Sequence, residues 1–124
     1  MSAQERVFNE TLLSVENISL SFGAVKAISD VSFDIKKGEI RAIIGPNGAG
    51  KTSMLNCING FYHPQLGQMI YKGAVRKQMK PHETAANGVA RTFQNVALFR
   101  GMTTLDNLMT GRNLKFNKWK TCLL

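Results

Sequence analysis

Residues 45–52, GPNGAGKT, constrain the fold of this chain more than any other part of the sequence. They match the pattern G-x-x-x-x-G-K-[ST], in which a glycine-rich loop joins a buried β-strand to a helix. The preceding run, residues 40–44, is apolar and β-branched except at Arg41 and Ala42, as is typical of a strand buried on both faces. A helical pattern begins at Lys51. We therefore predict a strand–loop–helix unit here.

This loop has the composition needed to bind phosphate. Its glycines let the backbone fold tightly, so that successive N–H groups point at phosphate oxygens, and the helix adds the positive end of its dipole. Lys51 is predicted to reach the β and γ phosphates, and the Thr52 hydroxyl to ligate Mg²⁺. An ordinary glycine-rich turn is disfavoured by the flanking elements. The predicted cofactor-binding residues of the loop are Gly45, Pro46, Asn47, Gly48, Ala49, Gly50, Lys51, Thr52 and Ser53.

The rest of the pattern predicts an α/β chain. Alternating apolar residues indicate strands over residues 12–22 and 31–35, with shorter strands at 68–71 and 89–93. The helix from Lys51 is expected to place Met54, Leu55 and Ile58 on one face and to end at Gly60. Further helices are expected over residues 81–86 and after Thr104, as its cap, with Leu105, Leu108 and Met109 on the apolar face.

Charge and cysteine usage exclude several classes. The net charge is +8, but the lysines and arginines are scattered and accompany no nucleic-acid motif, so we expect no nucleic-acid partner. No apolar stretch reaches the roughly 20 residues that span a bilayer, and the first residues do not resemble a secretion signal. Cys57 and Cys122 lack disulfide or metal-ligand spacing, which fits a reducing cytosol, and Cys57 is expected in the core.

Three segments resemble the nucleotide-binding domains of ABC transporters. The first is GPNGAGKTSMLNCING, which resembles the Walker A segment of that family. The second is FGAVKAISDVSFDIKKGEI, similar to the stretch that leads into Walker A, and the third is ARTFQNVALFRGMTTLDNL, similar to the Q-loop region. LNCINGFYHP and the Q-loop block more narrowly resemble the ATP-binding subunits of branched-chain amino-acid importers. The resemblance runs from about residue 12 to 112.

The resemblance implies both the fold and the surroundings of the chain. The fold would be α/β, an incomplete ABC-type P-loop core packed beside an N-terminal antiparallel β region, and residues 1–112 would be the N-terminal part of the nucleotide-binding domain. The cofactors would be ATP and Mg²⁺. The partners would be transmembrane permease subunits and a second nucleotide-binding subunit, at the cytoplasmic face of the plasma membrane and without membrane insertion of this chain.

Two more site residues follow from the resemblance. Phe22 would be the aromatic residue that stacks on adenine, although a core residue ending a strand is an equally good interpretation. Gln94 would be the Q-loop glutamine, a catalytic residue and metal neighbour that approaches Mg²⁺ and the attacking water. As an isolated residue Gln94 is an ordinary polar loop position, and its flanks favour the functional role.

Later motifs of the family are missing from the sequence. It contains no LSGGQ-type signature and no switch histidine after Gln94, and no acidic residue follows Gly111, so a Walker B aspartate and catalytic glutamate are absent. We therefore expect a truncated or frame-disrupted product with an atypical basic tail at 113–124, and no steady hydrolysis. The alternatives are a catalytically dead nucleotide-binding remnant and a small regulatory binding module. A GTPase or kinase is disfavoured, since no N-K-x-D motif occurs.

Overall fold

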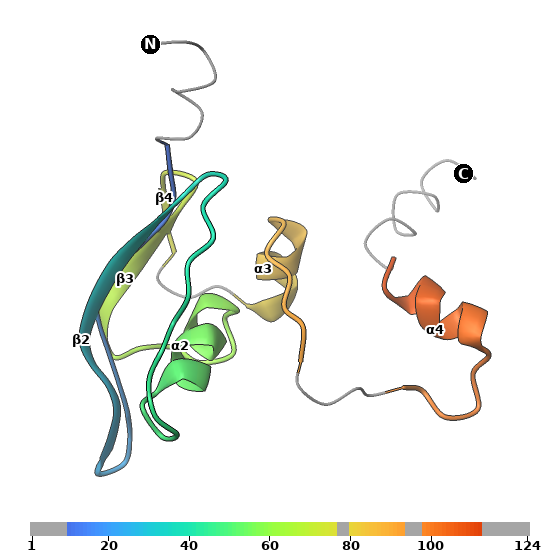
Figure 1. Cartoon of the computed structure of the whole chain (residues 1–124), viewed down its shortest axis with the longest axis horizontal. Helices are drawn as coiled ribbons and strands as arrows, with labels where there is room; N and C mark the ends of the chain where they lie inside the picture. The colour runs from blue at the N-terminus through green and yellow to red at the C-terminus, as the bar shows by residue number, and fades with distance from the viewer. Residues whose placement is uncertain (1–9, 77–79, 94–97, 113–124) are drawn as a thin grey trace. The chain divides into compact units, whose positions relative to one another are not determined.

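The computed structural model describes residues 10–76, 80–93 and 98–112 (Figure 1). It contains two compact units, residues 1–90 and 91–124, and each is described by itself. None of the described helices is both long and apolar enough to cross a membrane. Gln94 and the tail predicted at 113–124 lie outside the described residues. The elements are β1 (Thr11–Phe22), β2 (Val25–Lys36), α2 (Lys51–Ile58), β3 (Leu66–Tyr71), β4 (Ala74–Val75) and α3 (Pro81–Ala86) in the first unit, and α4 (Thr104–Thr110) in the second.

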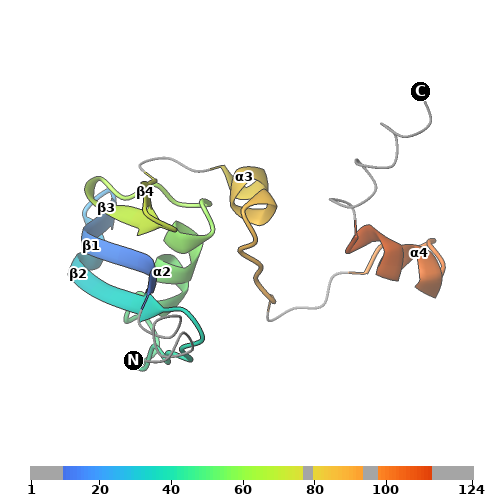
Figure 2. The same cartoon turned by 90° about the horizontal axis from the view of Figure 1, so that it is seen from above.

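The first unit is built on a four-stranded antiparallel sheet in the order β2-β1-β3-β4 (Figure 2). β1 and β2 form a hairpin in which Phe22 pairs with Val25. The positive φ of the intervening Gly23, 57°, suits a tight hairpin turn, because glycine adopts this conformation without a side-chain clash. The antiparallel β region expected from the sequence is therefore confirmed.

A bulge divides β1 into two halves with opposite alternation. Leu13 and Val15 are buried before it, and Ile18 and Leu20 after it, so the buried positions change from odd to even. Asn17 lies at the change with a φ of 51°, and its side-chain amide donates to Asp30 Oδ1 on β2 at 2.9 Å. Because an extra residue reverses which face a strand presents, the bulge lets the whole of β1 bury its apolar residues on one side.

That side of the sheet packs against α2 and forms the core. Met54 and Cys57 of α2 are buried in one cluster with residues of β1, β2 and β3, and Figure 2 shows α2 beside one face of the sheet. Polar residues occupy the opposite face, where Ser14 donates to Asp34 at 2.9 Å and Gln68 donates to Glu16 at 2.8 Å. An antiparallel sheet with one buried face accommodates this pattern. Leu55, predicted on the buried face of the helix, is instead exposed.

The expected helices are present with small differences. α2 begins at Lys51 as predicted and is followed by Gly60 with a φ of 79°, and α3 covers Pro81–Ala86 as predicted. α4 is capped one residue earlier than expected. The Thr103 hydroxyl accepts from the N–H of Asp106 at 3.1 Å, while Asp106 accepts from the N–H of Thr103 at 3.2 Å. This reciprocal pair favours Thr103 over Thr104, because only the residue three before an acidic side chain completes it.

The strand predicted at residues 40–44 is not formed. None of the four strands pairs with this segment, and Ile40 and Ile44 are 98% and 92% exposed. A strand buried on both faces needs neighbours on each side, and the described sheet provides none in parallel orientation. Apolar composition alone therefore gave the wrong prediction of its pairing and burial.

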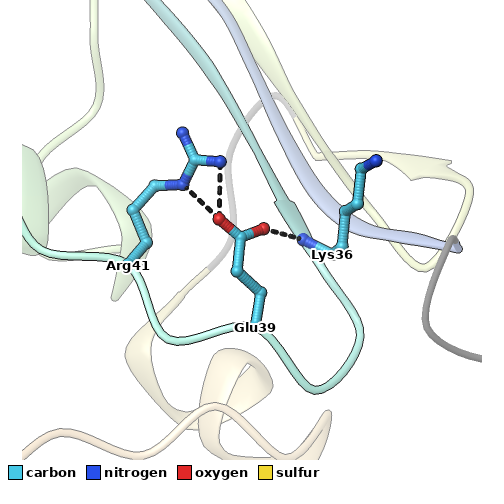
Figure 3. A network of polar contacts seen from close by, with 3 residues as sticks. All are labelled: Lys36, Glu39 and Arg41. Atoms are coloured by element: carbon cyan, nitrogen blue, oxygen red, sulfur yellow. Dashed lines mark hydrogen bonds and ion pairs between the residues drawn. The ribbon is translucent and has the colours of Figure 1, made fainter.

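A polar network closes the turn between β2 and this segment (Figure 3). Glu39 accepts a hydrogen bond from the Lys36 N–H at 2.8 Å and pairs with Arg41, whose Nε donates to it at 2.7 Å. The Lys36 N–H first, and then the Arg41 guanidinium, hold the pKa of Glu39 below its usual value. The network joins the last residue of β2 to Arg41 in the segment that follows.

The strand predicted at residues 89–93 is also absent. Val89 is half-buried against the core, and its N–H donates to Thr84 O at 3.2 Å at the end of α3. This bond joins Val89 to the helix that precedes it. The described residues contain no neighbouring strand that pairs with 89–93, so its β-branched and aromatic composition has no ladder to join.

Cys57 is predicted to resist thiol reagents while the chain is folded. It is 1% exposed, as expected of a core residue, and burial raises the pKa of its thiol to about 11 from a usual 9.0. Because the thiolate is the nucleophile, a shift of this size lowers reactivity near pH 8 roughly 100-fold before any steric protection is counted. Timed labelling of a Cys122→Ser variant with Ellman's reagent, with and without denaturant, measures this. Equal rates in both conditions would contradict the buried position of Cys57.

Candidate functional site

The loop between residues 45 and 50 turns tightly into the N-terminus of α2. The Ala49 N–H donates to Pro46 O at 3.2 Å, and Gly48 and Gly50 have φ values of 84° and 81°. Gly50 is the N-cap of α2 and makes no side-chain cap hydrogen bond. Since the first N–H groups of a helix have no partner within it, this N-terminus is suited to bind an anion.

Gly50 also fixes the loop against the sheet. A Cβ atom on this residue would lie 2.3 Å from the carbonyl oxygen of Ala27 in β2. Glycine is required here for two reasons, a left-handed φ and direct contact between two backbones. The sequence pattern indicated a glycine in the loop but not its contact with β2.

Lys51 lies folded back over the loop. Its Nζ donates to Gly45 O at 2.5 Å and to Pro46 O at 2.6 Å. The side chain is therefore held by carbonyl oxygens of the loop, and a phosphate bound there would have to replace them as the partner of the ammonium group. Thr52, the predicted magnesium ligand, is exposed in the first turn of α2, and Ser53 beside it is half-buried.

Phe22 lies at the end of β1, next to the hairpin turn. Its ring is 47% exposed and meets Tyr62 edge to face, with ring centroids 5.0 Å apart. Ala27, which touches Gly50, lies five positions further along the same hairpin. Phe22 is therefore not a buried core residue. It lies on the hairpin whose second strand contacts the loop at Gly50. Tyr62, which sequence reasoning had not singled out, supports it from the segment after α2.

The structure brings the predicted residues 45–53 together in one loop and helix turn, with Phe22 in the same unit. Gln94 lies outside the described residues, so no position is assigned to it. Among the described residues, no group of three or more histidine, cysteine or acidic side chains is arranged to hold a metal ion.

A glycine-rich turn that leads directly into a helix whose first residues are Lys-Thr defines the class of P-loop proteins. The family model described as "ABC transporter" matches residues 28–122. The chain belongs to the ABC transporter family.

The individual relatives agree with this assignment. The chain is 39% identical over 105 residues to the high-affinity branched-chain amino acid transport ATP-binding protein LivG of Salmonella typhimurium, covering 85% of this chain and 41% of LivG. It is 38% identical over 110 residues to the ribose import ATP-binding protein RbsA 2 of Burkholderia cenocepacia, covering 89% of this chain and 22% of that protein.

A solved structure agrees as well. MJ1267, an ATP-binding cassette of an ABC transporter, superposes with a TM-score of 0.76 at 36% identity over 84% of this chain and 41% of that one. The chain thus spans about two fifths of the length of LivG and of this cassette. These matches confirm the expected resemblance to the N-terminal part of an ABC-transporter ATP-binding subunit of the branched-chain amino-acid importer type.

Proposed function

We propose that this chain binds Mg·ATP through residues 45–53, as the nucleotide-binding part of an ABC-transporter ATP-binding subunit. One observation carries the proposal. The left-handed glycines Gly48 and Gly50 lead into a helix N-terminus without a side-chain cap, and the ammonium group of Lys51 lies across the same loop. This combines backbone N–H groups, a helix dipole and a positively charged side chain at one place, which is what binding of a polyphosphate needs.

In the proposed mechanism each group has one task. The N–H groups at the start of α2 would bind phosphate oxygens, Lys51 would exchange the carbonyls of Gly45 and Pro46 for the β and γ phosphates, and the Thr52 hydroxyl would be a ligand of Mg²⁺. Phe22 stacks on the base. Gln94 is proposed to approach the metal and the attacking water. Mg²⁺ supplies charge neutralisation of the phosphates when it is bound.

The finer proposal concerns the transported substrate. LivG is named for branched-chain amino-acid transport and RbsA 2 for ribose import, at almost equal identity, but the chain spans a larger share of LivG. We infer a role in branched-chain amino-acid import. Its partners would be transmembrane permease subunits and a second nucleotide-binding subunit, with this chain peripheral to the cytoplasmic face of the membrane.

A pair of chimeras tests the substrate. Residues 12–112 of this chain replace the aligned part of LivG in one chimera and of RbsA 2 in the other, and uptake of labelled leucine or ribose is measured in strains lacking the native subunit. The proposal predicts that leucine uptake is restored and depends on Lys51, with little ribose uptake. Restoration of ribose uptake alone would assign the chain to the other class of importer.

Phe22 is predicted to supply base stacking. Phe22→Leu keeps an apolar side chain but removes the π-face, so the affinity for ATP is expected to fall by roughly 1–3 kcal/mol. The affinity for inorganic triphosphate should stay the same, because it has no base. Phe22→Tyr retains the ring and serves as the matched control. Fluorescence titrations measure the affinity for each ligand. An equal loss of affinity for ATP and for triphosphate would contradict a stacking role.

A further inference from the structure

Residues 62–65 join the two halves of the candidate nucleotide site. They follow α2, the helix that begins at the proposed phosphate loop, and they contact the end of β1, the strand that carries Phe22. The Tyr62 N–H donates to the carbonyl of Asn56 in α2 at 3.2 Å, so the segment is anchored to the helix. At its other end, Gln65 is bonded to β1. The segment therefore connects the element proposed to bind phosphate with the residue proposed to stack on the base.

Gln65 takes the place of a neighbouring strand at the end of β1. The pairing of β3 with β1 ends where Leu66 meets Ser19, and the Gln65 N–H donates to the carbonyl of Ser19 at 3.0 Å. The Gln65 side chain then continues the ladder to Ser21. Its Oε1 accepts from the Ser21 N–H at 2.9 Å, and its Nε2 donates to the Ser21 carbonyl at 2.9 Å. The amide thus supplies both the acceptor and the donor that a paired backbone would supply.

These contacts hold Phe22 in place from two sides. Ser21 immediately precedes Phe22, so the bonds from Gln65 fix the backbone that carries the ring on one edge of β1. On the other edge, Phe22 itself pairs with Val25 of β2. The ring meets Tyr62 edge to face, a geometry that aromatic pairs prefer and that restricts the rotation of an exposed side chain. A ring that is already ordered loses less conformational entropy when a base stacks on it.

We propose that Gln65 and Tyr62 are positioning residues for recognition of the nucleotide base. Gln65 fixes the backbone beside Phe22, Tyr62 fixes its ring, and the ring is held ready for the base. Neither residue contacts phosphate in this role, so both should raise the affinity for a nucleoside triphosphate and leave the affinity for inorganic triphosphate unchanged. This role rests on the proposed stacking of Phe22 on the base.

The test separates binding of the base from binding of the phosphates. Gln65→Met keeps the length of the side chain and removes both amide bonds to Ser21. Isothermal titration of the full chain is expected to show a roughly 3- to 10-fold lower affinity for ATP, a part of the stacking contribution, and an unchanged affinity for inorganic triphosphate. The matched control is Gln68→Met, since Gln68 of β3 donates to Glu16 in the middle of β1 at 2.8 Å. This control should bind both ligands as the parent does.

Two further sets of variants test whether the effect acts through the Phe22 ring. Tyr62→Leu removes the ring that Phe22 meets and is expected to lower the affinity for ATP by a similar factor, whereas Tyr62→Phe keeps the ring and should bind as the parent does. In a Phe22→Leu background, Gln65→Met is expected to cause no further loss of affinity for ATP, because the ring that it positions is gone.

Inorganic triphosphate also distinguishes failure of this role from failure of the proposed function. A parent that binds neither ATP nor triphosphate would overturn both. If the parent binds both ligands and Gln65→Met loses no more affinity for ATP than Gln68→Met does, only the positioning role is overturned. Equal losses for ATP and triphosphate in Gln65→Met, or a further loss for ATP in the Phe22→Leu background, would overturn that role as well.

Discussion

Gly50→Ala is expected to destabilise the first unit strongly and to abolish nucleotide binding. The new Cβ would meet Ala27 O at 2.3 Å, and the residue would have to keep a φ of 81°. A left-handed conformation costs a residue with a side chain roughly 1–2 kcal/mol. Forcing an atom into a packed contact adds typically about 1–3 kcal/mol. Urea unfolding followed by circular dichroism should show that the free energy of unfolding falls by on the order of 3 kcal/mol.

Gly48→Ala is the matched control for this prediction. Gly48 has nearly the same φ, 84°, but a Cβ added to it would meet no atom within 4 Å. The substitution therefore brings only the conformational cost, roughly 1–2 kcal/mol. Equal destabilisation by the two variants would mean that contact between the loop and β2 is unimportant, and the close approach of Gly50 to Ala27 would be wrong.

Lys51→Ala is expected to reduce the affinity for Mg·ATP by roughly 10- to 100-fold, since a hydrogen bond to a charged group contributes about 1.5–3 kcal/mol. Among the described residues, this ammonium group donates hydrogen bonds to the carbonyl oxygens of Gly45 and Pro46. The substitution should therefore change the stability of the fold little. The affinity for the triphosphate should fall most, and the affinity for the monophosphate least. Isothermal titration with ATP, ADP and AMP measures the series.

Lys72→Ala is the matched control for Lys51→Ala. Lys72 is exposed, and its Nζ donates to a backbone carbonyl, Asn87 O, at 3.1 Å, so the variant loses one positive charge and one bond of the same kind. Its affinity for ATP should equal that of the parent. If Lys72→Ala lowers the affinity for ATP as much as Lys51→Ala does, both effects come from the change in net charge. Lys51 would then make no specific contact with the nucleotide.

The sequence predicted elements best where the signal is local. The start of α2 at Lys51 and both ends of α3 at Pro81 and Ala86 follow from a P-loop, a proline and helical spacing, all readable within one turn of helix. The core position of Cys57 follows from the same helical pattern. The candidate site over residues 45–53 was predictable as a set because its residues are consecutive.

Features that depend on distant partners were not predictable. Residues 40–44 and 89–93 have strand composition, but a strand exists only where another strand pairs with it, and composition does not report that. The contact of Gly50 with Ala27 joins residues 23 positions apart. Tyr62 beside Phe22 likewise follows from the way the loop after α2 returns to the end of β1.

The most direct test of the central claim is the response of the backbone amides of the P-loop to nucleotide. Two-dimensional NMR of the ¹⁵N-labelled chain is recorded during a titration with Mg·ATP. We predict that the largest shifts occur at the N–H groups of residues 47–53, that ATP exceeds AMP in effect, and that Lys51→Ala removes the response at the same concentrations. Shifts confined to other parts of the chain, or none at saturating Mg·ATP, would contradict the assignment of this loop as a nucleotide-binding site.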